Sequence, residues 1–166
     1  MKVPLCIPDI TEADVQRVAE VVRSGWLTDG PYNEQLEADF ARYMGVKHAI
    51  SLNSCTSALH LSVLGLGITG EVITPSFTWA STANAIITAG ARPVFVDIDY
   101  ATCNVDPAAV AAAVTPNTEA IMVVHYAGQV CDMEAILTIA SRHGLAVIED
   151  SAETIGGERH GKKGGT

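Results

Sequence analysis

The stretch Gly144-Leu-Ala-Val-Ile-Glu-Asp150-Ser-Ala-Glu153 ends an apolar run in acidic residues, and it points to both a fold class and a site. Residues 145–149 have the composition of a buried strand, which places Asp150 just past its carboxyl end. Open α/β sheets bind their ligands at that edge. Because a buried carboxylate is costly without a cationic partner, Asp150 predicts a positively charged group in the ligand.

The rest of the chain alternates between segments typical of strands and of helices. Strands are expected at His48–Leu52, Val72–Ile73, Pro93–Ile98, Ile121–His125 and Leu145–Glu149. Helices are expected at Thr56–Leu66, Trp79–Ala89, Pro107–Val114 and Asp132–His143, and a turn or hairpin at 156–165. This alternation predicts an α/β fold in three α/β/α layers, with a mainly parallel sheet covered on both faces.

Two helices are expected before this alternating part. Thr11 and Asp14 form a predicted capping box, and valines at helical spacing follow in a helix that ends near Gly25. Asn33 is expected to cap the second helix, Glu34–Met44.

The bulk composition narrows the functional classes. The chain has 166 residues, of which 48% are hydrophobic, and this suits one globular domain with a sizeable core. A net charge of −9 argues against a nucleic-acid partner. No apolar stretch reaches the roughly 18 residues of a membrane span, and no signal-peptide pattern opens the chain. Four scattered cysteines indicate reduced thiols in a cytoplasmic protein: Cys6, Cys55, Cys103 and Cys131.

Three further features follow predicted strands. The turn Asn53–Ser57 begins a helix with small hydroxyl residues and could bind an anion, although a plain helix cap is the simpler interpretation. Trp79 could stack on a planar ring or pack against the protein. His125 is expected to be satisfied by local backbone. Its spacing to Cys131 and Asp132 fits no standard zinc pattern, so no metal site is predicted.

An anion-binding turn, an aromatic plate and a buried acid at one sheet edge suit a phosphorylated, flat, protonatable heterocycle. Pyridoxal phosphate needs those three things: a held phosphate, a sandwiched ring and a carboxylate that keeps its pyridine nitrogen protonated. No glycine-rich dinucleotide motif or P-loop offers a competing phosphate site. A Rossmann-like domain for another phosphorylated ligand is the alternative.

The chain resembles the DegT/DnrJ/EryC1/StrS family of pyridoxal-phosphate-dependent sugar-nucleotide aminotransferases. The matching stretches are Ser24–Pro31 (SGWLTDGP), Ser54–His60 (SCTSALH), Glu71–Trp79 (EVITPSFTW), Gly90–Asp99 (GARPVFVDID), Val124–Gly128 (VHYAG) and Ile148–Glu153 (IEDSAE). The resemblance implies the large-domain fold of the aspartate-aminotransferase-like transferases. Residues 1–166 would be the N-terminal part of that cofactor-binding domain, truncated and without the C-terminal small domain.

The resemblance also implies roles for individual residues. Cys55, Thr56 and Ser57 match the phosphate-binding turn, in which the family commonly has glycine at the position of Cys55. Trp79 matches the aromatic that stacks on the cofactor ring, and Asp150 matches the partner of the pyridine nitrogen.

Three more positions match the surroundings of the cofactor. Glu153 corresponds to a residue near the ring hydroxyl that is often His or Gln in the family. Trp26 and Thr28 lie in a segment that matches the substrate side of the site. The family's catalytic lysine, which attaches the cofactor as a Schiff base, matches a motif beyond Thr166. No catalytic residue is therefore expected within the chain.

The parent protein is thus expected to move an amino group from an amino acid, glutamate, to a nucleotide-linked keto sugar. The implied setting is polysaccharide biosynthesis by a cytoplasmic homodimer. Two alternatives stay open. The parent could be a sugar dehydratase that uses pyridoxamine phosphate and has histidine in place of the lysine. The chain alone could be an inactive fold or dimerisation module.

Overall fold

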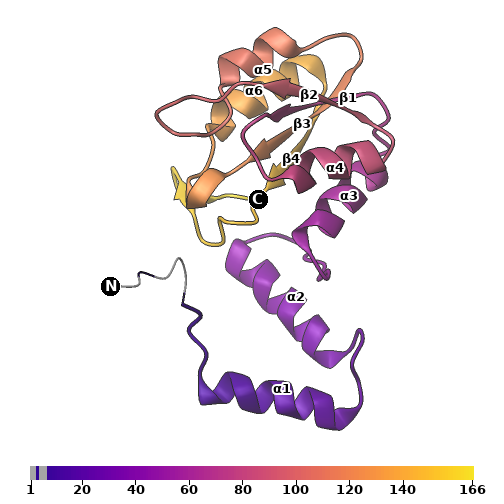
Figure 1. The fold of residues 1–166 in the computed structure, drawn as a ribbon, viewed down its shortest axis with the longest axis vertical. Helices are drawn as coiled ribbons and strands as arrows, with labels where there is room; N and C mark the ends of the chain where they lie inside the picture. The colour runs from indigo at the N-terminus through magenta and orange to yellow at the C-terminus, as the bar shows by residue number, and fades with distance from the viewer. Residues whose placement is uncertain (1–2, 4–6) are drawn as a thin grey trace. The chain divides into compact units, whose positions relative to one another are not determined.

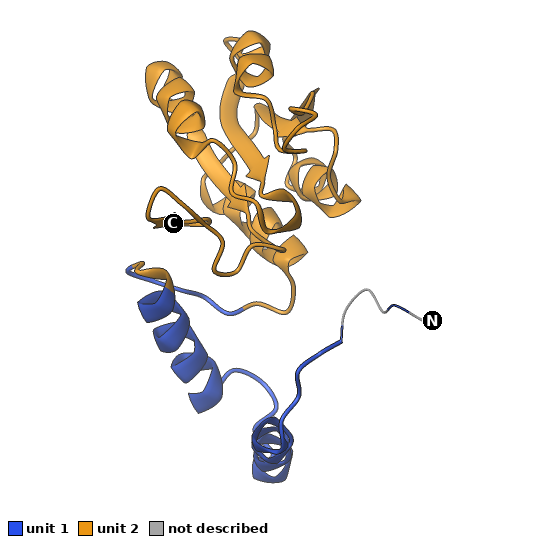
Figure 2. Cartoon of the chain, turned by 90° about the vertical axis from the view of Figure 1, so that its left-hand side faces the viewer, with its two compact units in different colours: residues 1–43, 47–51 blue, residues 44–46, 52–166 orange. Residues whose placement is uncertain are grey.

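The computed structural model describes residue 3 and residues 7–166, so the prediction for Cys6 lies outside the described residues. The chain divides into two compact units, residues 1–43 with 47–51 and residues 44–46 with 52–166 (Figure 2). Across the described part of the chain, every helix is too short or too polar to cross a membrane.

The first unit is built on two helices, α1 (Glu12–Ser24) and α2 (Pro31–Met44), the last residue of which belongs to the second unit. The predicted capping box opens α1: the backbone N–H of Thr11 donates to Asp14 Oδ2 (2.8 Å), and that of Asp14 donates to Thr11 Oγ1 (3.4 Å). The helix ends at Gly25, whose φ of +73° favours a residue without Cβ. The prediction for α1 is confirmed.

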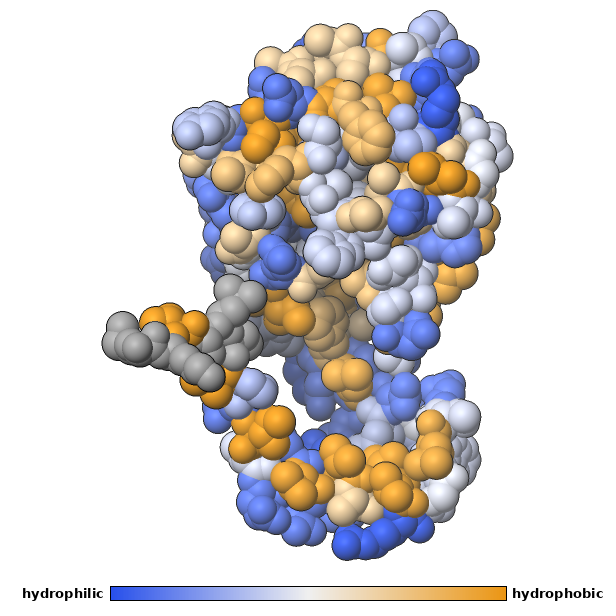
Figure 3. Space-filling view, viewed as in Figure 1, coloured by the Kyte–Doolittle hydropathy of each residue, from blue (hydrophilic) through white to orange (hydrophobic). Residues whose placement is uncertain are grey.

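Apolar side chains of α1 are exposed along one side of the helix. Figure 3 shows apolar atoms gathered over α1, where Val18 and Val22 are 65% and 61% exposed. With Tyr32 and Leu36 of α2 they line a groove of about 380 Å³. The amphipathic spacing of the valines is therefore present in the folded helix.

The second helix begins earlier than predicted. Asn33 lies inside α2 instead of capping it, because Gly30 O accepts the backbone N–H groups of Asn33 (2.9 Å) and Glu34 (3.1 Å). Pro31 is the first helical residue, a position where its missing N–H costs nothing. The Asn33 side chain donates to Ser51 Oγ at 3.2 Å instead.

The predicted strand at 48–52 is wrong. Residues 48–52 form no strand, and Ile50 is 80% exposed. A strand needs a neighbouring chain segment for its ladder of hydrogen bonds. Here the backbone N–H of Ser51 donates to the Glu37 carboxylate at 2.7 Å, so a side chain takes the place of a ladder partner.

The second unit contains a four-stranded parallel sheet with the order β2-β1-β3-β4 (Figure 1). Its strands are β1 (Glu71–Pro75), β2 (Arg92–Val96), β3 (Thr118–Val124) and β4 (Ala146–Asp150). Its helices are α3 (Cys55–Gly65), α4 (Ala80–Thr88), α5 (Pro107–Ala113) and α6 (Met133–His143), with a 3-10 turn at Tyr126–Gly128. The segment expected as a turn or hairpin is an antiparallel hairpin, β5 (Glu158–Arg159) with β6 (Lys162–Lys163).

Helices cover both faces of this sheet. One core joins α3 and α4 to the sheet and includes Leu59, Val63, Ile86 and Met122; the other joins α5 and α6 to the opposite face and includes Val110, Ile121, Val123 and Ile136. Met122 and its neighbours Ile121 and Val123 point to opposite faces, as the strand period of two requires. Each such fully buried side chain stabilises the fold by roughly 1.5–3 kcal/mol. The predicted three-layer α/β/α arrangement is confirmed.

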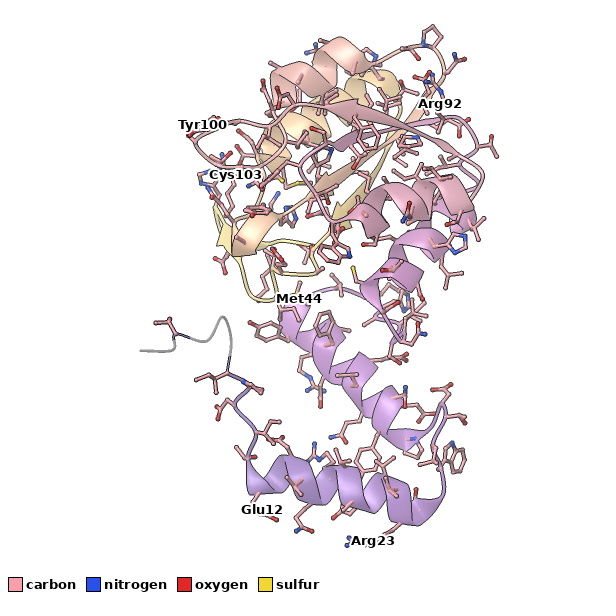
Figure 4. All side chains as sticks on the ribbon, viewed as in Figure 1. Glu12, Arg23, Met44, Arg92, Tyr100 and Cys103 are labelled. Atoms are coloured by element: carbon pink, nitrogen blue, oxygen red, sulfur yellow. The ribbon has the colours of Figure 1, made fainter. Side chains whose placement is uncertain are left out.

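A buried glutamate lies at the amino edge of the sheet, opposite the predicted site. Glu71 is 4% exposed and accepts hydrogen bonds from Thr115 Oγ1 (2.7 Å) and from the guanidinium of Arg92, which begins β2 at the same edge (Figure 4). The Thr115 hydroxyl, and next the Arg92 charge, hold the pKa of Glu71 below its usual value.

This lowered pKa predicts acid-sensitive stability. A carboxylate with a lowered pKa in the folded state contributes stability above its ordinary pKa of 4.5 and loses it as the pH falls through the lowered value. We expect Glu71→Gln to be less stable than the wild type at pH 7 and the gap to narrow as the pH falls below 4.5. Urea unfolding at several pH values measures the gap, with exposed Glu158→Gln as the control. A gap that is constant with pH would contradict the prediction.

Candidate functional site

A cavity of about 480 Å³ opens in the second unit, where β3 and β4 end. The residues that line it are Cys55, Thr56, Phe77, Thr78, Trp79, Ser81, Val124, His125, Tyr126, Asp150, Ala152 and Glu153. Five of the six residues predicted to bind a cofactor are among them; Ser57 is the exception. The topology explains part of this convergence, because parallel strands bring the segments that follow β1, β3 and β4 to one edge. Cys55 and Thr56 follow no strand and reach the cavity at the start of α3, which packs on the sheet.

Asp150 is the last residue of β4, so the strand runs one residue further than predicted. The side chain is buried (5% exposed), and its Oδ2 accepts from Thr82 Oγ1 at 2.9 Å. Its Oδ1 accepts from the backbone N–H of Ala152 (3.3 Å) and from the thiol of Cys55 (3.6 Å). These three donors, a hydroxyl, a backbone amide and a thiol, are neutral. Asp150 is therefore a buried acid whose donors in these bonds carry no charge.

The Asn53–Ser57 turn at the N-terminus of α3 has the features of a plain helix cap and also those of an anion-binding turn. Ser54 is the cap and accepts from the backbone N–H of Ser57 at 3.1 Å. The Ser57 hydroxyl donates to Asn53 Oδ1 at 2.8 Å, so it serves the turn and lies outside the cavity. Thr56 lines the cavity, and its backbone N–H has no acceptor in the part of the chain that the structure describes. The positive end of the helix dipole therefore faces the cavity with Thr56 as its donor.

The Cys55 thiol lies between this turn and Asp150. Burial, and next the negative charge of Asp150, raise the pKa of Cys55 to about 11. The thiol therefore keeps its proton at neutral pH and can donate it to the carboxylate.

Trp79 is the N-cap of α4 and is 81% exposed while lining the cavity. Of the two interpretations of this side chain, packing into the core of the second unit is wrong. Beside it, the rings of Phe77 and Tyr126 pack with centroids 4.9 Å apart. The open indole face is available to a flat ligand.

Glu153 supports the turn that bears Tyr126. Its Oε2 accepts from the backbone N–H of Ala127 at 2.9 Å, and Ala127 has a φ of +50°. Its carboxylate therefore holds an unusual backbone conformation and lines the cavity at the same time.

His125 has a structural role, as expected. It is 1% exposed, and its Nδ1 accepts from the backbone N–H of Cys131 at 3.1 Å. Its Nε2 lies 2.8 Å from Glu149 Oε2 and donates to it, because Nδ1 is already an acceptor. The imidazole is thus held by β4 and by the loop before α6.

The sequence interpretation missed two residues near the cavity. Thr82 of α4 holds Asp150, and its four-residue spacing from Thr78, which precedes the helix, was the available signal. Asn104 accepts from the backbone N–H of Tyr126 and donates to Gln129 O, both at 3.0 Å, and so spans the turn beside the cavity. Nothing in the sequence marked Asn104.

Trp26 and Thr28 lie in the first unit, in the loop between α1 and α2. They line a cavity of about 240 Å³ within that unit, and the Trp26 indole N–H donates to Asp29 O. Their assignment to the substrate side stays a prediction.

The parallel sheet and the buried acid at its carboxyl edge define the class: an α/β domain with a cavity at the edge where such sheets bind ligands. Residues 8–166 match the model of the DegT/DnrJ/EryC1/StrS aminotransferase family, and the chain belongs to this family. The predicted family resemblance is confirmed.

Relatives agree in sequence and in structure. The spore coat polysaccharide biosynthesis protein SpsC of Bacillus subtilis is 50% identical over 154 residues, which are 92% of this chain and 40% of SpsC. The aminotransferase TlmJ of Streptoalloteichus hindustanus is 40% identical, with a TM-score of 0.90 over 96% of this chain and 44% of TlmJ. NtdA of Bacillus subtilis, solved with bound cofactor PMP, is 37% identical, with a TM-score of 0.84 over 89% of this chain and 35% of NtdA. The chain thus spans less than half the length of these relatives.

Proposed function

We propose that the full-length protein is a pyridoxal-phosphate-dependent aminotransferase that moves an amino group from glutamate to a nucleotide-linked keto sugar. Family membership and the similarity to SpsC support the reaction class and polysaccharide biosynthesis as its setting. The observation that carries the proposal is Asp150, a buried carboxylate held by neutral donors at the ligand edge of the sheet. The proposal includes a homodimer in the cytoplasm, with residues 1–166 as the N-terminal part of a large domain that a small domain follows.

The residues around the cavity fit pyridoxal phosphate. Thr56, at the positive end of α3, would hold the phosphate, and Trp79 would cover one face of the ring. Asp150 would pair with the ring nitrogen and keep it protonated, and Glu153 would lie beside the ring hydroxyl. Bound there, the cofactor would supply an electron sink for proton transfer at the carbon that bears the amino group. The lysine that attaches the cofactor is proposed to lie beyond Thr166.

An amino-transfer assay on the full-length protein tests this function. With glutamate, pyridoxal phosphate and a nucleotide-linked 4-keto sugar, we expect one 2-oxoglutarate for each amino sugar formed. The sugar with its keto group reduced to an alcohol is the matched control and should give no sustained formation of 2-oxoglutarate beyond the single conversion of bound cofactor to its amine form. Loss of a sugar hydroxyl without release of 2-oxoglutarate would contradict the proposal and favour the dehydratase.

A further inference from the structure

The Asp150 carboxylate has a specific pattern of filled and open acceptor positions. Two carboxylate oxygens offer about four lone-pair positions. In the bonds described for residues 7–166, Oδ1 accepts from Ala152 N–H (3.3 Å) and from the Cys55 thiol (3.6 Å), and Oδ2 accepts from Thr82 Oγ1 (2.9 Å). These three donors leave one position, and it belongs to Oδ2.

The chemistry of the groups fixes the direction of these bonds. An ionised carboxylate only accepts, so the Thr82 hydroxyl must give its proton to Asp150. The Thr82 oxygen is then free to accept from Thr78 Oγ1, 2.8 Å away. Thr82 is fully buried, so water does not compete for the hydrogen bond that its hydroxyl donates to Asp150.

The two side-chain donors come from helices that also carry other parts of the site. Thr82 lies on α4, which begins next to Trp79, and Cys55 is the first residue of α3, next to Thr56. The position of the carboxylate therefore depends on the helix that begins next to Trp79 and on the helix that begins at the anion-binding turn with Thr56. The thiol keeps its proton for this bond, since its pKa is raised to about 11.

We propose that Thr82 and Cys55 are positioning residues that hold the Asp150 carboxylate from two helices and leave one position of Oδ2 for a cationic ring N–H. This inference rests on the proposed function and deepens it. It assigns Cys55 a contact with the Asp150 carboxylate, whereas the family resemblance matched this residue to the phosphate-binding turn. A glycine at this position offers no such side-chain donor.

Binding of pyridoxamine phosphate to the full-length protein tests the role of Thr82. Thr82→Val keeps the shape and removes the donor, and we expect affinity measured by calorimetry to fall at least about tenfold. Thr82→Ser should restore affinity to within about twofold of the wild type, because it keeps the hydroxyl. Thr88→Val is the matched control on the same helix, where the hydroxyl donates to the backbone carbonyls of Asn84 (2.7 Å) and Ala85 (3.3 Å).

A spectroscopic measurement separates positioning from a merely structural role. With pyridoxamine phosphate labelled with ¹⁵N in its ring, Thr82→Val should change the nitrogen chemical shift, and Thr88→Val should not. A Thr82→Val protein with wild-type affinity and shift would overturn the proposal. Asp150→Asn shows which claim fails. If Asp150→Asn binds pyridoxamine phosphate as tightly as the wild type, the proposed cofactor site is wrong. If Asp150→Asn weakens binding and Thr82→Val does not, only the positioning role of Thr82 is wrong.

Alkylation tests the Cys55 contact without any Thr82 variant. Cys55 is exposed enough to react with iodoacetamide, and mass spectrometry of its peptide gives the rate. Asp150→Asn should speed alkylation of Cys55 at pH 9 at least about threefold. Without the negative charge of Asp150, a larger fraction of Cys55 is in the reactive thiolate form. An unchanged rate would overturn the Cys55 half of the proposal. Cys103, on the loop before α5, is the internal control and should react equally in both proteins.

Discussion

Asp150→Ala is expected to lower amino transfer by the full-length protein about a thousandfold. Removing one partner of a buried ion pair costs about 3–5 kcal/mol. In this site the remaining partner would be the protonated ring nitrogen. Because each 1.36 kcal/mol of lost stabilisation is tenfold in rate, about 4 kcal/mol corresponds to a factor of about a thousand. Initial rates of 2-oxoglutarate formation at saturating cofactor measure the loss.

Two controls separate the charge of Asp150 from its shape and from general effects. Asp150→Asn keeps the size and an acceptor oxygen, so a comparable loss assigns the effect to the charge. Asp39→Ala removes an exposed aspartate whose ion pair with Arg42 lies on the surface of α2, where such pairs contribute little. If Asp150→Ala kept more than about a tenth of the wild-type rate, the assigned role would be wrong.

The parallel sheet could be predicted because its signals are local. Short apolar runs alternate with helical spacing and caps, and each of these needs only its own segment to be recognised. The segment 48–52 had the same local signal, yet Ser51 bonds to the Glu37 side chain and no strand forms. Whether a strand forms depends on a ladder partner, which alternation within one segment does not reveal.

The sequence could predict which residues lie at the edge of the sheet but not the hydrogen bonds that join them. Asp150 ends β4 and Trp79 follows β1, so the topology of a parallel sheet brings them to one edge, and Thr56 joins them from the start of α3. The contact of Thr82 with Asp150 joins residues 68 positions apart, and that of Asn104 with Tyr126 joins residues 22 apart. Such contacts depend on how α4 and the loops pack, which no local pattern determines.

His125→Ala is expected to lower the free energy of unfolding by about 4 kcal/mol. The substitution leaves the buried N–H of Cys131 without its acceptor and removes a donor from Glu149, at about 1–3 kcal/mol for each unsatisfied group. It also empties the space of a side chain that is 1% exposed. Urea unfolding of the full-length protein measures the change.

Residues 164–165, which follow the β5–β6 hairpin, contact His125 and Glu149, so they indicate where the His125→Ala protein should loosen. A Cβ at Gly164 would lie 2.9 Å from Cδ2 of His125, so the backbone there packs directly on the imidazole. Glu149 Oε2 also accepts from the N–H of Gly165 at 2.8 Å. Loss of the ring should therefore loosen residues 164–165 first, which hydrogen exchange detects as faster exchange of the Gly165 amide. His143→Ala, on the exposed last turn of α6, is the matched control. If His125→Ala and His143→Ala lowered the free energy of unfolding equally, the structural role assigned to His125 would be wrong.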